Sequence, residues 1–420
     1  MCYQTIVIGG GPSGLMAAIS SSAQGQNVLL LEKKKGLGRK LKISGGGRCN
    51  VTNRLPYNEI IKHIPGNGKF LYSPFSVFDN ESIISFFESR GVPLKEEDHG
   101  RMFPVSNKSE DVLHALVETL NQQHVTIKEE TTVTSVSKNS EQCFEVVTDD
   151  HQTYVSKSLI IATGGTSVPQ TGSTGDGYRF AKTFNHTITE LFPTEVPIKS
   201  SEAFIKLETL KGLSLKNVAL SVLKKNGKKR VTHQMDMIFT HFGISGPAAL
   251  RCSQFVYYEQ KQQKQPLIDM HLDVFPDMNE AELKAYVTTL LSSTPDKIVK
   301  NSLHGLIEER YLTFMLSKAE IDTNTTYHHL TSQQLNQFIH LLKNFTFKVN
   351  GTLPLDKAFV TGGGVSIKEI MPATMASKLV PGLFFCGEVL DIHGYTGGYN
   401  ITSALVTGYV AGYYAGFHTL

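Results

Sequence analysis

Three glycines near the start of this chain, Gly9, Gly11 and Gly14, have the spacing of a phosphate-binding turn. In a GxGxxG turn the first glycine permits a tight bend and the second brings bare backbone close to a pyrophosphate. The third lets a helix pack closely against a strand. Pro12 and Ser13 stand where that helix begins, and free N–H groups at a helix N-terminus favour phosphate. The turn therefore predicts a dinucleotide site.

A carboxylate follows at the distance that such a site requires. Residues 3–8 and 27–32 have the character of buried parallel strands, and 13–24 that of a helix. Glu32 ends the second strand, 18 residues after Gly14, where it can accept hydrogen bonds from ribose hydroxyls. An acid there disfavours the 2′-phosphate of NADP. The single fingerprint, without a second one for a nicotinamide domain, favours FAD over NAD.

The predicted elements extend this start into a discontinuous α/β domain. Further strands are predicted at 131–137, 143–148 and 158–163, and helices at 80–90, 109–123 and 401–416. The middle of the chain is strand-rich after Pro193 and helical from about residue 277. We therefore predict an FAD-binding domain in two parts, 1–193 and 357–420, an inserted strand-rich domain, 194–275, a helical subdomain, 276–343, and a return strand, 344–356.

Local signals inside the insertion predict a turn and two helix starts. Asn226–Gly227 between strands predicts a type I′ hairpin turn. Asp277 with Glu280, and Thr331 with Gln334, have the spacing of capping boxes.

Composition and charge narrow the class of protein. A formal net charge of +3 over 420 residues favours neither a dedicated nucleic-acid binder nor a polybasic membrane protein. The basic run at 224–230 flanks the predicted turn, and we interpret it as a solvated tip rather than a nucleic-acid site. No run of about 18 apolar residues appears, so no membrane span is expected.

The cysteines and histidines exclude two further kinds of chemistry. The five cysteines stand far apart and form no CxxC or CxxxxC pair, which excludes a dithiol–disulfide reductase mechanism. Their scatter favours a reducing, cytoplasmic location. The 15 histidines form no HExxH motif or Cys/His cluster, so no metal is expected.

Three longer segments carry a family resemblance. They are GRKLKISGGGRCNVTN at 38–53, FTHFGISGPAAL at 239–250, and the glycine-rich stretch from VTGGGVSIKE to GYTGGYNITSA at 360–404. Over essentially its whole length the chain resembles the BaiN/YhiN-like flavoproteins, also called the aminoacetone oxidase family. The resemblance implies an α/β fold with a Rossmann-like FAD domain of the glutathione-reductase and fumarate-reductase type. It also implies an inserted β-barrel-like module and a small helical subdomain.

The resemblance implies non-covalent FAD held by loops and strand ends from both parts of the domain. Beyond the glycine turn, the expected contacts are Glu32, Lys33, Arg39, Lys40, Ser44, Gly45, Gly46, Gly47, Arg48, Cys49, Asn50, Val133, Ala162, Thr163, Gly164, Asp176, Gly387, Glu388, Asp391, Gly397, Gly398, Tyr399, Asn400 and Ile401.

The first half of these contacts is expected around the adenosine and the pyrophosphate. The glycine-rich loop at 44–50 turns backbone amides toward the pyrophosphate, the ribityl chain and the ring. Arg39 and Lys40 offer cations on the pyrophosphate or adenosine side, unless the loop is simply solvated. Val133 and the strand end at 162–164 are expected on the adenine side.

The second half is expected around the ribityl chain and the flavin ring. Glu388, helped by Asp391, is expected at a ribityl hydroxyl, where the wider superfamily has aspartate. The final helix, from Gly397, places positive potential at flavin N1 and O2. Two residues keep alternatives: Cys49 is a reactive thiol or a small packing residue, and Asp176 lies in an active-site loop or a simple turn.

Catalytic candidates are His393, Tyr395 and Tyr399, beside the expected ring, and His241 in the insertion. We predict an FAD-dependent oxidoreductase acting on a small molecule. Flavin N5 would receive hydride from transiently bound NAD(P)H, or from an amine-type donor, and pass it to an enone, a carbonyl compound or oxygen. The alternative is a structural or sensory FAD protein with an RNA-associated role. The oligomeric state stays open.

Overall fold

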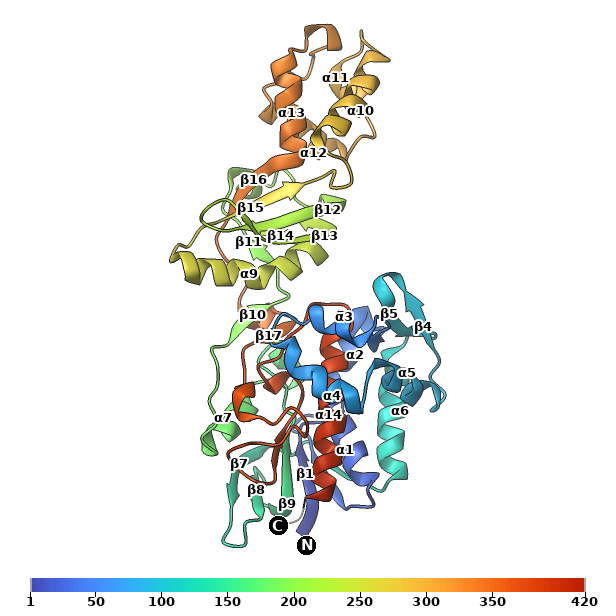
Figure 1. Cartoon of the computed structure of the whole chain (residues 1–420), viewed down its shortest axis with the longest axis vertical. Helices are drawn as coiled ribbons and strands as arrows, with labels where there is room; N and C mark the ends of the chain where they lie inside the picture. The colour runs from blue at the N-terminus through green and yellow to red at the C-terminus, as the bar shows by residue number, and fades with distance from the viewer. Residues whose placement is uncertain (1, 419–420) are drawn as a thin grey trace. The chain divides into compact units, whose positions relative to one another are not determined.

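A computed structural model describes residues 2–418 in two compact units (Figure 1). Unit 1 comprises the chain up to Phe192 and again from Leu355, and unit 2 comprises Pro193–Pro354. The two described ends of the chain meet in unit 1, where the Gln4 side-chain amide donates to the carbonyl of His418 (2.7 Å).

The central sheet of unit 1 combines strands from both ends of the chain. Its order is β6-β2-β1-β9-β8-β7, and β18 pairs with β9. The bounds are β1 (Cys2–Ile8), β2 (Val28–Leu31), β6 (Thr126–Lys128), β7 (Val133–Lys138), β8 (Phe144–Thr148), β9 (Thr153–Ile161) and β18 (Leu383–Phe385).

Strand β9 connects the parallel and antiparallel parts of this sheet. Its N-terminal half pairs antiparallel with β8, while its C-terminal half, from Leu159 to Ile161, pairs parallel with β18. Its other edge is parallel to β1 along its length. The apolar residues of β1 and β9 that predicted buried strands are almost wholly inaccessible, and the predicted discontinuous α/β fold is confirmed.

The remaining elements of unit 1 surround this sheet. The helices are α1 (Pro12–Ser22), α2 (Arg39–Ile43), α3 (Tyr57–Lys62), α4 (Tyr72–Val77), α5 (Asn80–Glu88), α6 (Ser109–Gln122), α7 (Asp176–Thr183) and α14 (Tyr399–Phe417). A small sheet has the order β3 (Thr52–Asn53), β5 (Arg101–Pro104), β4 (Leu94–Glu97), and β17 (Val360–Gly362) belongs to the second part of the unit. Strand β10 (Phe192–Thr194) crosses the boundary into unit 2. The helices predicted at 80–90, 109–123 and 401–416 are confirmed to within two residues at each end.

Helices α1 and α14 lie side by side because glycines let their backbones touch (Figure 1). A Cβ on Gly408 would stand 2.3 Å from the carbonyl oxygen of Ser13, and one on Gly412 would stand 2.0 Å from that of Ala17. Since real side chains do not approach so closely, only glycine fits at either position. The contact holds the C-terminal helix against the helix that follows the glycine turn.

Unit 2 is a closed six-stranded sheet with helices. The sheet order is β11 (Ile198–Lys199), β14 (Gly243–Ser245), β13 (Lys229–Phe239), β12 (Ser214–Leu223), β15 (Ile268–Asp273), β16 (Phe345–Val349). Just beyond β16, Thr352 bridges to Ile198 of β11, so the two edges of the sheet join and the strands close like a barrel. The helices are α8 (Ala203–Lys206), α9 (Pro247–Gln263), α10 (Glu280–Ser292), α11 (Val299–Ser302), α12 (Glu309–Lys318) and α13 (Ser332–Asn344).

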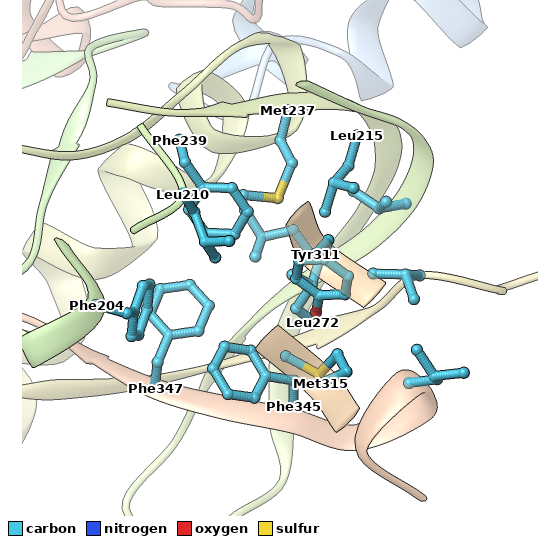
Figure 2. Close-up of a cluster of buried hydrophobic side chains, with 14 of the residues drawn as sticks. Phe204, Leu210, Leu215, Met237, Phe239, Leu272, Tyr311, Met315, Phe345 and Phe347 are labelled. Atoms are coloured by element: carbon cyan, nitrogen blue, oxygen red, sulfur yellow. The ribbon is translucent and has the colours of Figure 1, made fainter. Parts of the chain in front are cut away.

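One hydrophobic core runs through the strands and helices of unit 2. Figure 2 shows Phe204, Phe345 and Phe347 grouped on one side, with Phe239 and Tyr311 opposite. Several ring pairs in this cluster lie within about 6 Å, an arrangement that adds to the stabilisation from buried area.

Two local predictions in unit 2 were wrong. The hairpin turn is not type I′: the Gly227 N–H donates to the carbonyl of Lys224, and only the glycine has positive φ (+77°). The loop therefore uses a type I turn followed by a left-handed glycine, the commonest longer hairpin.

The second wrong prediction is the capping box at Asp277. The box forms at Asn279 and Glu282, because the Asp277 carboxylate accepts from Asn217 and Gln234 of the sheet. The box at Thr331 and Gln334 is confirmed.

Among residues 2–418, no helix combines the length and the apolar character needed to cross a membrane.

The contact between α1 and α14 predicts a contrast between two glycines of one helix. Gly412→Ala should lower the free energy of unfolding by about 1–3 kcal/mol, because its Cβ would meet the backbone of Ala17. Gly416→Ala is the control, since its Cβ would lie no closer than 3.2 Å to any atom, against 2.0 Å at Gly412; its nearest neighbours are the Gln24 side chain and the Ser21 carbonyl oxygen. Urea unfolding of both variants measures the difference. Equal stabilities would contradict close packing at Gly412.

Candidate functional site

The glycine turn separates packing glycines from one that faces open space. Gly9 has φ of +111° and its Cβ would meet the Ala162 carbonyl at 2.5 Å. At Gly14 a Cβ would stand 1.9 Å from the Gly9 oxygen. At Gly11, which precedes α1, nothing lies within 4 Å. Gly9 and Gly14 are thus required by the protein's own packing, while Gly11 borders room for a ligand at a helix N-terminus.

Glu32 lies beside this turn at the end of β2. Its carboxylate accepts from the N–H of Gly10 (2.7 Å) and from that of Lys34 (2.8 Å). Its carbonyl accepts from Thr131, two residues before Val133 begins β7. The structure therefore brings the predicted ribose acid and the predicted adenine-side strand together.

Lys33 and Asp176 form an ion pair at the N-terminus of α7. Lys33 Nζ lies 2.5 Å from an Asp176 oxygen. Burial opposes ionisation of Asp176, but Lys33 and Thr174 outweigh it and lower the pKa of the carboxyl. Both residues were expected near the cofactor. Their contact closes the 172–176 loop onto the end of β2.

A second ion pair joins the two parts of the unit. Lys40 Nζ lies 2.8 Å from Glu388 Oε2 and donates to Ser167 (2.7 Å). Glu388 Oε1 accepts from Ser167 Oγ (2.9 Å) and from the Thr361 N–H (2.8 Å). Burial alone would raise the pKa of Glu388, but the charge of Lys40 and these donors lower it.

This pair refines the roles expected of both residues. Lys40 was expected to offer its charge to the pyrophosphate or adenosine side, and in the structure it neutralises Glu388. Gly387 packs against Ser13, where a Cβ would stand 2.4 Å from the hydroxyl. The pair therefore lies beside the glycine turn. Arg39 donates to backbone carbonyls of Lys35 (3.0 Å) and Gln170 (3.5 Å) on the surface.

The loop at 44–50 presents bare backbone on one side. Gly45, Gly46 and Gly47 all have positive φ, and a Cβ on Gly46 or Gly47 would meet nothing within 4 Å. Ser44 ties the loop to the carbonyl of Leu41 (2.7 Å). Only glycine takes this run of left-handed conformations readily, and the open side leaves room for a flat ligand.

The next three residues of the loop are held by protein contacts. Arg48 pairs with Glu97 (2.9 Å) and covers the ring of Phe103 at 4.0 Å. Its charge therefore has a protein partner, although it was expected to face the cofactor. Burial raises the pKa of the Cys49 thiol to about 12, which favours the packing role over a reactive thiol. The Asn50 amide accepts from the Gly398 N–H (2.9 Å).

The segment before α14 forms a braced turn. Gly397 and Gly398 have positive φ (+134° and +91°), and Gly398 precedes the helix. The Asn400 side chain accepts from the Gly394 N–H (2.8 Å) and donates to the carbonyls of Gly394 and Tyr395. Ile401 follows in the first turn of the helix.

Two residues that the sequence did not single out contact Tyr399. The ring of His63 stacks on Tyr399 with 4.7 Å between centroids and 10° between planes. Asn53 donates to the Tyr399 hydroxyl oxygen at 3.4 Å. The Asn53 position lies inside the 38–53 motif, but nothing in the sequence marked His63.

His393 and Asp391 are held by a strand-like contact. The backbone of His393 exchanges hydrogen bonds with Gly66 (2.9 and 3.2 Å), whose bare Cα lies against the imidazole. Burial, partly opposed by Glu388, lowers the pKa of His393 to about 4. The pKa of Asp391 is raised by burial. His393 is therefore neutral at neutral pH.

The other predicted positions divide between the two units. Ala162, Thr163 and Gly164 follow β9, beside Gly9 and Ser173. His241 belongs to unit 2, where it is exposed and its ring packs against Phe242. Within the described chain, no group of three His, Cys, Asp or Glu side chains is placed to hold a metal ion.

The sequence of this chain matches the family described as HI0933-like protein Rossmann domain over residues 3–414. The chain belongs to the HI0933-like family. It is an FAD-dependent oxidoreductase, the class that its motifs predicted.

Relatives of known activity cover nearly the whole chain. A ribosomal RNA dihydrouridine synthase of Escherichia coli is 29% identical over 95% of this chain and 94% of its own length. A 3-dehydro-bile acid delta(4,6)-reductase of Clostridium scindens is 29% identical over 96% and 97%. The solved 3-ketosteroid delta1-dehydrogenase of Sterolibacterium denitrificans, 11% identical, covers 99% of both chains with a TM-score of 0.53 and shares the fold.

The residues of this HI0933-like protein fit a flavin dinucleotide. Bare backbone borders open space at Gly11 and again at Gly46 and Gly47. The carboxylate of Glu32 lies beside the first of these openings, and the N-terminus of α14 lies beside the loop at 44–50, through Asn50. We expect the pyrophosphate at Gly11 and the flavin near the loop and α14.

The geometry of the glycine turn predicts that substitutions at its second and third glycines impair different properties, FAD affinity at Gly11 and apoprotein stability at Gly14. Gly11→Val should leave the apoprotein folded, since the position is open, and weaken FAD binding by about tenfold or more, or about 1.4 kcal/mol. Gly14→Ala should instead destabilise the apoprotein, because its Cβ would overlap the Gly9 oxygen. Apoprotein Tm and FAD fluorescence titration separate the two effects. Native FAD affinity in Gly11→Val would place the pyrophosphate elsewhere.

His393 predicts an acid-sensitive part of the stability. Its pKa falls from 6.5 to about 4 on folding, so the unfolded chain binds this proton at higher pH than the folded chain. Its contribution is complete above about pH 6.5 and is lost, by about 3 kcal/mol, as pH falls to about 4. His393→Gln should flatten the pH dependence of unfolding over this range. The exposed His151→Gln is the control, and an unchanged slope in His393→Gln would contradict burial of a neutral imidazole.

Proposed function

We propose that this protein uses FAD to reduce a carbon–carbon double bond conjugated to a carbonyl, with NAD(P)H as the hydride donor. The observation that carries this proposal is the chemistry shared by the two full-length relatives. Dihydrouridine is uridine with its C5–C6 double bond reduced, and that bond is conjugated to the C4 carbonyl. A 3-oxo bile acid with delta-4,6 double bonds is likewise a conjugated ketone.

We further propose that the acceptor is a uracil base in RNA. Residues 221–235 of unit 2 contain five basic side chains and no acidic one, a charge pattern that suits a phosphate backbone. A steroid-like enone would need no such surface. The same reaction on a free small molecule is the alternative.

The chain's own residues would hold the cofactor and supply a proton. Bound FAD, once reduced by NAD(P)H, would supply the hydride. Backbone at Gly11 and the carboxylate of Glu32 bind the pyrophosphate and ribose, and Lys40 keeps Glu388 ionised beside them. Reduction of the double bond adds a hydride to the carbon β to the carbonyl and a proton to the α carbon.

Tyr399 is the proton donor we favour. It is the first residue of α14, beside the loop at 44–50, and Asn53 donates to its hydroxyl oxygen (3.4 Å). His393 is a poorer donor, because an imidazole with a pKa of about 4 holds no second proton at neutral pH. Tyr395, four residues earlier in the same segment, is the next candidate.

Anaerobic stopped-flow kinetics test the reaction. NADH or NADPH should bleach the flavin, and an enone or a uridine-containing RNA should restore its colour without oxygen. Tyr399→Phe should slow this second step by about 10²–10⁴-fold while leaving flavin reduction unchanged. Tyr409→Phe, on the same helix and stacked on Phe78, is the control.

Three outcomes would count against the proposal. Reoxidation by oxygen alone, after reduction by an amine, would favour amine oxidation. A flavin that no nicotinamide reduces would favour the structural or sensory role. Equal rates for Tyr399→Phe and the wild type would move the proton donor to Tyr395 or to solvent.

A further inference from the structure

The tip of the β12–β13 hairpin carries the densest positive charge of unit 2. Lys225, Lys228 and Lys229 are exposed and Lys224 is half-buried. None of these four lysines has an ion-pair partner in the part of the chain that the structure describes. Some exposed lysines elsewhere in the unit are neutralised, as Lys348 is by Asp269 (2.8 Å).

This clustering of positive charges destabilises the hairpin when no ligand is bound. Lys224 and Lys228 face each other across the turn, where the Lys224 N–H donates to the Lys228 carbonyl (2.9 Å). Like charges directly opposite on paired strands are destabilising. A ligand with closely spaced negative charges would relieve the repulsion.

The hairpin tip is fixed against helix α9. Arg230 pairs at 3.7 Å with Glu259, whose side chain is almost fully buried. The Gln263 amide donates to the carbonyl of Leu223 (3.3 Å), at the end of β12. Because one contact lies on each strand, the lysines project from a braced hairpin rather than from a loose loop.

The last turns of α9 carry two further cations and aromatic rings. Lys264 directly follows Gln263, whereas Lys261 lies two residues from both Glu259 and Gln263, on another face of the helix, and both lysines are exposed. Lys261 Nζ lies 5.1 Å from the ring centre of Tyr257, and the rings of Tyr257 and Tyr258 are 5.9 Å apart. Cations interleaved with aromatic rings suit RNA, which offers phosphates and stacking bases together.

A membrane surface fits this site less well. An interfacial anchor needs several apolar side chains beside its cations. Between residues 208 and 277 the structure has one exposed large apolar residue, Leu267.

We propose that the hairpin tip and the C-terminal end of α9 form a docking surface for the phosphate backbone of RNA. The choice of RNA as the anionic partner rests on the proposed function. The proposed surface also differs from the expectation of a merely solvated tip. The bracing of the hairpin by Glu259 and Gln263 is what the sequence alone did not indicate.

Charge-matched triple variants of the FAD-loaded full chain test the surface. The test variant is Lys225→Gln with Lys228→Gln and Lys229→Gln. The control is Lys284→Gln with Lys297→Gln and Lys318→Gln, three exposed lysines of the same unit that lie outside the hairpin and α9. Binding of a fluorescein-labelled RNA stem–loop with uridines in its loop is followed by anisotropy over a range of salt concentrations.

We expect the test variant to bind this RNA about tenfold or more weakly and to lower the salt slope of log K by about three, while the control keeps both values. Equal effects of the two variants would overturn the proposal, since they would show general charge attraction. Unchanged RNA binding with loss of binding to phosphatidylserine vesicles would overturn it in favour of a membrane.

A free enone separates this proposal from the reaction itself. NAD(P)H-dependent reduction of a small enone should be the same in wild type and test variant, because the lysines lie outside unit 1. If the wild type reduces neither the enone nor the uridines of the RNA but its RNA binding depends on these lysines, the reaction is wrong and the surface stands. If enone reduction occurs and RNA binding does not depend on the lysines, only the proposed docking surface is wrong.

Discussion

The close contact between α1 and α14 is the constraint on which the site depends. Gly408 and Gly412 let the C-terminal helix lie directly on the backbone of Ser13 and Ala17. This approach sets Gly387 against Ser13, and so places Glu388 beside the glycine turn. Without it, the residues from the two ends of the chain would not share one site.

The Lys40–Glu388 pair follows from that contact and sets the charge of the site. A half-buried carboxylate next to an expected pyrophosphate would repel it, and partial burial disfavours the charge further. Lys40, Ser167 and the Thr361 N–H compensate for both effects and hold the acid ionised. The lysine thereby cancels a negative charge beside the glycine turn.

The sequence predicted what depends on short stretches of chain and missed what depends on distant partners. The glycine turn, the strand that ends at Glu32 and the final helix follow from local patterns, and all three are present. The Lys40–Glu388 pair joins residues 348 positions apart, and no pattern announces it. The capping box forms at Asn279 rather than at the predicted Asp277 for the same reason. Side chains from the sheet, which are distant in sequence, donate hydrogen bonds to the Asp277 carboxylate.

Burial suppresses the ionisation of several groups around the expected flavin. Burial raises the pKa of the Cys49 and Cys386 thiols to about 12, so neither is a thiolate there. It lowers that of His393 to about 4. Thiolate chemistry is thereby suppressed, and the flavin is left as the redox centre. On the proposed reaction, the chain holds the cofactor and supplies a proton, while the flavin carries the redox chemistry.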